Sequence, residues 1–297
     1  MKNIKQITLI LVIIAVVSIT VAALLLFVSN GYNIDASEYQ VSENKMISFT
    51  NISSIEINTV STSIEIVESN SENIEVYLTG QTTSKINEVP ELTVTKEDNT
   101  LKIAVEYKNL GASFFNFGGM HDMNLQLKIP RNKVGMDITT VSGDLEVSNF
   151  EFADFKFKGT SADAVINNIT SYNFNFNTVS GGLKAVNIET GEVVTETTSG
   201  DVSFNSLKSG SLNAKSVSGK VNLDYVELTN DIDIKTTSGD VKVKLPADSS
   251  FVIDFDSTSG DLENRFAGMT TESVIMVNGG EHRFVVRTTS GDLDVFN

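Results

Sequence analysis

The stretch TVSGDLEV at residues 140–147 reveals the architecture, because copies of it return along the second half of the chain. The clear copies are TVSGGLKAV (178–186), TTSGDVSF (197–204), SVSGKVNL (216–223), TTSGDVKVKL (236–245), STSGDLENRF (257–266) and TTSGDLDVF (288–296). The worn copies are GTSADAVI (159–166) and NTVSTSIEI (58–66). The chain is therefore a repeat protein in which each copy marks one structural unit.

The spacing of these copies is regular. With Ala162 taken as a worn glycine, the key positions are 143, 162, 181, 200, 219, 239, 260 and 291, so the gaps are 19, 19, 19, 19, 20, 21 and 31 residues. Four equal gaps in succession indicate stacked units of one size. The long last gap predicts an insertion within 264–282.

Apolar and polar residues alternate on both sides of each turn, as in SLNAKSVSGKVNLDYV at 211–226, and this period of two predicts half-buried strands. One such unit cannot bury its inward row alone, whereas stacked units can. We therefore predict an all-β fold, a single-stranded β-solenoid (β-helix) with coils of about 19 residues. Equivalent residues would form columns with a spacing of about 4.8 Å. An antiparallel sandwich or barrel is the alternative, but neither requires identical turns at a fixed period.

The N-terminal part carries an uncharged apolar run, ITLILVIIAVVSITVAALLLFV at 7–28, which is long enough for one transmembrane helix. Lys2 and Lys5 precede it, so the N-terminus is expected in the cytoplasm and the rest outside a single-pass cell-membrane anchor. A cleaved signal peptide is the alternative, and it exports the domain as well. The predicted segments are 1–6 (cytoplasmic), 7–28 (anchor), 29–45 (polar stalk), 46–130 (irregular β part of the solenoid) and 131–297 (regular solenoid).

The composition excludes several classes of function. The net charge is −16, from 22 Lys and Arg against 38 Asp and Glu, which disfavours binding to nucleic acid. The chain has no cysteine and two histidines, so thiol chemistry is excluded and a multi-histidine metal site is not expected. No cofactor is predicted.

A membrane anchor followed by repeated T-T/V-S-G-D turns resembles the bacterial β-strand-repeat proteins labelled "putative adhesin". These overlap the toastrack domains of envelope-stress proteins, and the LiaG-type membrane-anchored proteins are similar in layout. The resemblance covers most of residues 46–297 and is strongest over 138–297. It implies a β-helix with a role at the cell envelope, and it supplies no catalytic residue.

The turns themselves provide three columns of candidate residues. The glycines are expected to be structural and to supply positive φ angles; they are Gly143, Gly181, Gly200, Gly219, Gly239, Gly260 and Gly291. The aspartates that follow them could bind calcium, or accept hydrogen bonds from their own turns, which is the favoured hypothesis; they are Asp144, Asp163, Asp201, Asp240, Asp261 and Asp292. The equivalent serines, from Ser142 to Ser290, predict a hydroxyl ladder rather than nucleophiles.

Two further segments are candidates for interaction. The glycine-rich stretch 109–123 carries Phe114, Phe115, Phe117 and Met120, which could contact a partner or plug the core. The C-terminal strand at 292–296 is expected to end the solenoid, where it could support self-association or be blunted by its aspartates.

We therefore predict a non-catalytic interaction or scaffolding module of the bacterial cell envelope, within the envelope-stress response. Its expected partners are the plasma membrane, through residues 7–28, and an envelope protein or cell-wall component. The alternatives are a surface adhesin that binds a polymer or host ligand, and a carbohydrate-processing β-helix enzyme.

Overall fold

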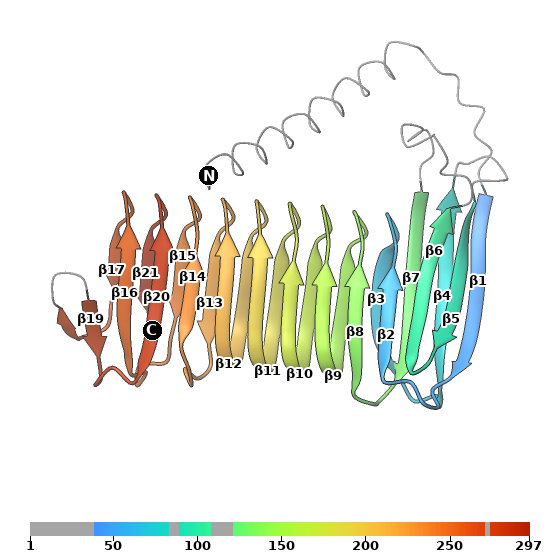
Figure 1. Cartoon of the computed structure of the whole chain (residues 1–297), viewed down its shortest axis with the longest axis horizontal. Coiled ribbons are helices and arrows are strands. Elements are labelled where there is room, and N and C mark those ends of the chain that lie inside the picture. Colours follow the sequence, from blue (N-terminus) through green and yellow to red (C-terminus); the bar gives the residue numbers. More distant parts are fainter. Residues whose placement is uncertain (1–38, 83–88, 108–120, 271–273) are drawn as a thin grey trace, which may run out of the picture.

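The computed structural model describes residues 39–82, 89–107, 121–270 and 274–297. All regular secondary structure in these residues is β, which confirms the predicted class, and 21 strands form one continuous sheet (Figure 1). No helix in the described part of the chain is long and apolar enough to cross a membrane. The predicted anchor at 7–28 and the residues Phe114, Phe115, Phe117 and Met120 lie outside the described residues.

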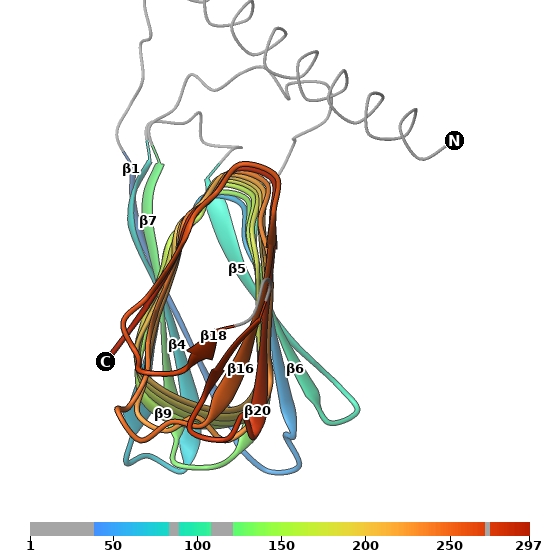
Figure 2. The ribbon, with the colours of Figure 1, turned by 90° about the vertical axis from the view of Figure 1, so that its left-hand side faces the viewer.

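The middle of the molecule is a solenoid built from four long parallel strands, which are β9 (Leu145–Lys158), β10 (Ala164–Asn177), β11 (Leu183–Thr197) and β12 (Val202–Ser216). Leu145 pairs with Ala164, Ala164 with Leu183, and Leu183 with Val202, so each step along the sheet is one 19-residue repeat. Each long strand bends once and contributes to both faces of a flattened coil, as the end-on view in Figure 2 shows. The repeat of the sequence is therefore the repeat of the structure.

The shorter strands extend these two faces. The face that follows the S-G-D turns includes β3 (Ser63–Ser69), β13 (Val221–Tyr225), β15 (Val241–Lys244), β17 (Leu262–Asn264) and β21 (Leu293–Phe296). The face that precedes the turns includes β2 (Ser54–Asn58), β8 (Val134–Thr139), β14 (Ile232–Lys235), β16 (Phe251–Ser257) and β20 (His282–Thr288). Their alternate apolar residues point inward and are buried, so the two faces enclose one core.

The C-terminal repeat does not end the solenoid. Strand β21 pairs with β15 on one side and with β17 on the other, and β20 likewise lies between β14 and β16. The last coil of the sequence is thus inserted before the coil of β16 and β17 (Figure 1). The expectation of an open C-terminal edge strand is wrong, because both edges of β21 are already hydrogen-bonded. The residues within 264–282 instead form a hairpin of β18 (Met269–Thr270) and β19 (Val274–Val277), and β19 pairs with β16.

The other end of the solenoid shows the same rearrangement. Strand β2 lies between β6 (Thr100–Tyr107) and β8, and β3 lies between β7 (His121–Pro130) and β9. The first coil of the sequence is therefore the second coil in space. At both ends, therefore, the order of the coils in space differs from their order in the sequence.

Antiparallel strands complete the N-terminal end. Strand β4 (Asn73–Thr82) lies between β1 (Tyr39–Ser48) and β7, and β5 (Pro90–Glu97) pairs with β6. Residues 39–45 were expected in the polar stalk, but they form the first part of β1, because β4 offers them a full antiparallel edge and Val41 is buried.

Candidate functional site

The turn edge, defined as the column of S-G-D turns from residues 58–62 to 288–292, is held by buried and half-buried hydroxyl groups. In six turns the glycine N–H donates to a Thr or Ser hydroxyl three residues earlier, at 2.6 to 3.0 Å. The acceptors are Thr140, Thr178, Thr197, Ser216, Ser257 and Thr288. The serine column, in contrast, is exposed, and Ser142, Ser218 and Ser259 donate to carbonyl groups of the neighbouring coil. The hydroxyl group that accepts the glycine N–H therefore belongs to the residue two positions before the serine proposed from the sequence, for example to Thr140 and not to Ser142.

The turn glycines are needed for close stacking and not for a positive φ. Among the described glycines only Gly80, Gly279 and Gly280 have positive φ angles, so the prediction of positive φ at the turn glycines is wrong. A Cβ added to Gly200 would lie 1.7 Å from the carbonyl oxygen of Gly181. At Gly200 the coils pass each other at a distance that leaves no room for a side chain.

The aspartate column links neighbouring coils. Asp144 accepts a hydrogen bond from the backbone N–H of Asp163 at 2.9 Å, and Asp201 accepts one from Lys220 at 2.8 Å. Asp292 does the same for Asp261 at 2.9 Å. These carboxylates therefore bind the equivalent residue one coil away, and not their own turns as predicted. Within the described residues, no group of three or more His, Asp or Glu side chains is arranged to hold a metal ion.

Replacing Thr197 with valine is expected to lower the free energy of unfolding by about 1–2 kcal/mol. Valine has the shape of threonine but leaves the buried N–H of Gly200, now 2.9 Å from the Thr197 hydroxyl, without this acceptor. Urea denaturation measures the change. Ser199→Ala is the matched control in the same turn, where the side chain is exposed, and a change larger than that of Thr197→Val would contradict the assignment.

The opposite edge of the solenoid, which we call the corner edge, carries an asparagine ladder. Asn149, Asn168 and Asn187 stand one repeat apart and all have positive φ angles, of 60°, 55° and 55°. The Asn168 side-chain amide donates to the Oδ1 of Asn149 at 2.8 Å, and Asn187 donates to Asn168 at 2.8 Å. Asparagine suits this corner because it tolerates the left-handed conformation and its amide both donates and accepts.

Asn168→Ala is expected to destabilise the protein by about 2 kcal/mol, since alanine loses both ladder bonds and is strained at positive φ. Asn168→Gly should cost about 1 kcal/mol less, because glycine adopts this conformation freely. Thermal unfolding of the two variants measures the difference. Equal losses of stability would show that the backbone conformation of the corner contributes nothing.

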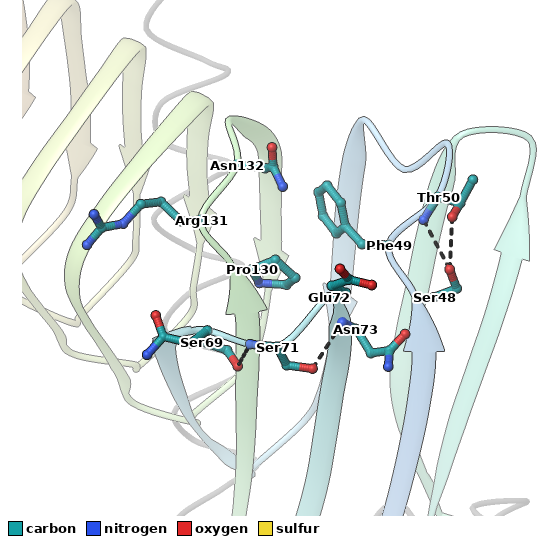
Figure 3. Close-up of a pocket in the computed structure, with 11 residues that line it drawn as sticks. Ser48, Phe49, Thr50, Ser69, Ser71, Glu72, Asn73, Pro130, Arg131 and Asn132 are labelled. Carbon is teal, nitrogen blue, oxygen red and sulfur yellow. Dashed lines mark hydrogen bonds between the residues drawn. The ribbon is translucent and has the colours of Figure 1, made fainter.

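Two hollows open on the corner edge around the link between β7 and β8. The first, called the Phe49 hollow, has a volume of about 620 Å³ and is lined by residues 48–50, 69–73 and 130–132. Figure 3 shows the Phe49 ring and Pro130 among hydroxyl and amide side chains and the carboxylate of Glu72, with Arg131 pointing away from them. The serine hydroxyls shape the turn at 69–73, where Ser69 accepts from the N–H of Ser71 and Ser71 from that of Asn73, each at 3.0 Å.

The second hollow, called the Lys133 hollow, has a volume of about 610 Å³ and shares Arg131 and Asn132 with the first. Its other lining residues are Glu68, Lys133, Asn149, Phe150, Glu151, Asn168 and Thr170. Arg131 forms a two-point ion pair with Glu68, and its hydrogen bonds lower the pKa of that carboxyl group. Lys133 lies 3.3 Å from a carboxylate oxygen of Glu151.

An exposed aromatic ring adjoins the Lys133 hollow. The Tyr172 side chain is 64% exposed, and the ammonium group of Lys133 lies 5.7 Å from the centre of its ring. Gly191 and Gly210 follow Tyr172 at the same position of the next two coils. The ring therefore stands beside a row without side chains.

Sequence reasoning located the turn edge but missed the corner edge. The asparagines were detectable, because Asn149, Asn168 and Asn187 repeat with the period of the turns. The hollows had no signal in the sequence. The Phe49 hollow forms where three links from distant segments meet, and the Lys133 hollow forms where the link between β7 and β8 meets β3, β9 and β10.

The comparisons with known proteins give one family match and several distant structural likenesses. The family model Toastrack DUF4097 matches residues 52–296, whereas no curated protein matches the chain. A solved "putative adhesin" from Bacteroides fragilis is 13% identical with a TM-score of 0.44, and the match covers 86% of this chain and 97% of that one. A "putative lipid binding protein" from Parabacteroides distasonis is 15% identical with a TM-score of 0.48, over 85% and 96% of the two chains. These two likenesses are too distant to indicate a ligand. The family match covers most of the chain and confirms the resemblance seen in the repeats: the chain belongs to the Toastrack DUF4097 family.

Proposed function

We propose that this protein is a non-catalytic interaction module that an N-terminal anchor displays on the outer side of the bacterial cell membrane. The observation that supports it best is the way the polar side chains are used. The turn carboxylates and hydroxyls hydrogen-bond neighbouring coils or turns, and many surface cations pair with a carboxylate one coil away, as Lys156 does with Asp137 and Lys215 with Glu196. Such a surface supports a rigid scaffold better than a reaction centre.

The location outside the membrane rests on the sequence. The run 7–28 is apolar, lysines precede it, and the chain that follows is acidic. A module of this kind would bring a partner in the envelope to the membrane, and a role in the envelope-stress response belongs to the same proposal.

A second candidate function, an adhesin that binds a polymer, is favoured by the two adjoining hollows on the corner edge. It differs from the first in what the bound polymer does: an adhesin would hold the cell to an outside surface, whereas the scaffold would bind a component of the cell's own envelope. Deletion of the gene should abolish attachment to a surface only if the adhesin hypothesis holds.

Crosslinking in cells tests the main proposal. A photoreactive amino acid at position 170, beside the Lys133 hollow, is expected to capture an envelope protein or cell-wall fragment that mass spectrometry identifies. The same amino acid at position 217, exposed on the turn edge, is the control. Capture of cytoplasmic proteins alone, or no capture at either position, would contradict the proposal.

A further inference from the structure

We propose that the corner edge, from the Phe49 hollow to Tyr172, binds a linear, uncharged polysaccharide. This inference rests on the proposed function and specifies its ligand. The two hollows share Arg131 and Asn132, and Lys133 connects the second hollow to the ring of Tyr172. The surface is thus an extended run rather than one isolated pocket, and an extended chain of sugar rings fits it better than a small compact molecule does.

The apolar parts of the run suit sugar rings. One face of a pyranose ring presents mainly C–H groups, and these pack against the flat face of an aromatic ring, while the hydroxyl groups at the rim remain free for hydrogen bonds. The run offers the half-buried Phe49 at one end and the exposed Tyr172 at the other, while Pro130 beside Phe49 is buried (Figure 3 shows Phe49 and Pro130). The glycine row at 191 and 210 leaves space beside Tyr172 for a chain to continue along the coils.

The charges of the run favour an uncharged ligand. Arg131 is paired with Glu68, and Lys133 is paired with Glu151. The carboxylate of Glu72 also lines the Phe49 hollow, so the run carries more acidic than basic groups and does not attract an anion. The net charge of −16 repels polyanions such as teichoic-acid-like phosphate polymers. The amide of Asn132 and the serine hydroxyls of the Phe49 hollow both donate and accept hydrogen bonds, as sugar hydroxyl and N-acetyl groups require.

Calorimetric titration of the full-length chain in mild detergent tests the inference, with chitohexaose and cellohexaose as neutral probes and polyglycerol phosphate as the anionic probe. We expect a neutral hexasaccharide to bind and Tyr172→Ala to weaken its binding about tenfold, the effect of losing one stacked ring. Tyr172→Phe should retain the affinity because it keeps the ring. Val217→Ala removes exposed apolar atoms from the turn edge and should change nothing.

The inference is overturned if the wild-type chain binds neither hexasaccharide, if it binds only polyglycerol phosphate, or if Tyr172→Ala binds as the wild type does. Because Tyr172 is exposed, unchanged thermal unfolding of Tyr172→Ala shows that any loss of binding is local. If the crosslinks to an envelope protein persist while no hexasaccharide binds, the glycan inference alone fails. If both are absent, the proposed function fails with it.

Discussion

Removal of residues 282–297 is expected to unfold residues 251–270 and 274–277, although these residues precede the deletion in the sequence. Strands β20 and β21 form the layer on which β16 and β17 rest, and β17 pairs with no described strand other than β21. The deletion also exposes the edges of β14 and β15, with their buried valines and isoleucines. The deletion removes one complete coil, and it also takes away the strands with which β16 and β17 pair in parallel. It should therefore destabilise the protein more than any single substitution does.

Hydrogen exchange measured by mass spectrometry distinguishes the two possible outcomes. The inserted order of the coils predicts that amides in 251–270 and 274–277 lose protection in the shortened chain, while those of β9 to β12 remain protected. In a solenoid built in sequence order, 251–264 would stay folded when only the last coil is removed, and continued protection there would contradict the inserted order. Removal of Asn297 alone, which is exposed and follows β21, is the control.

Gly200→Val is expected to destabilise the protein by about 3 kcal/mol or more, because overpacking against a fixed backbone is among the most damaging substitutions. The added Cβ would lie 1.7 Å from the oxygen of Gly181 and 3.1 Å from the nitrogen of Gly182, so adjacent coils would have to separate. Urea denaturation measures the loss of stability, and a change below about 1 kcal/mol would refute the close-stacking explanation.

The worn repeat provides the matched control for Gly200→Val. Ala162 occupies the equivalent position, and in its coil Gly159 stands where the other turns have a hydroxyl residue. A Cβ at Gly159 would lie 3.3 Å from that of Ala162. In this coil the methyl group of Ala162 therefore takes the place of the hydroxyl side chain that other turns carry three residues before the glycine. Ala162→Gly should therefore cost far less than Gly200→Val, close to the loss of about 1 kcal/mol typical of one buried methyl group.

The inward rows of the solenoid were predictable from the sequence. The alternation of apolar and polar residues predicts that Leu212, Ala214, Val221 and Leu223 lie on the inward side of half-buried strands, and all four are buried. The period of 19 then aligns them in columns, because hydrogen-bonded stacking of like coils is the arrangement that needs identical turns at equal intervals. The family resemblance follows from the same turns.

The order of the coils was not predictable in this way. Repeat spacing shows which residues are equivalent, but equivalent coils have almost the same edges and can stack in either order. The gap of 31 residues before Gly291 looked like a simple insertion, whereas it contains the hairpin of β18 and β19 that lets the chain double back. The hollows depend on a similar rearrangement at the other end, so their lining residues could not be grouped from the sequence.

Like residues stack one coil apart in this solenoid, and the last repeat is inserted before the one that precedes it. Since the chain has no cysteine, spin labels can be placed on pairs of exposed turn serines, Ser142 with Ser290 and Ser142 with Ser259. The structure predicts six coil steps for the first pair and seven for the second, or about 29 Å and about 34 Å at the usual strand spacing. Pulsed electron paramagnetic resonance should therefore find Ser290 nearer to Ser142 than Ser259 is; the reverse order would contradict this stacking.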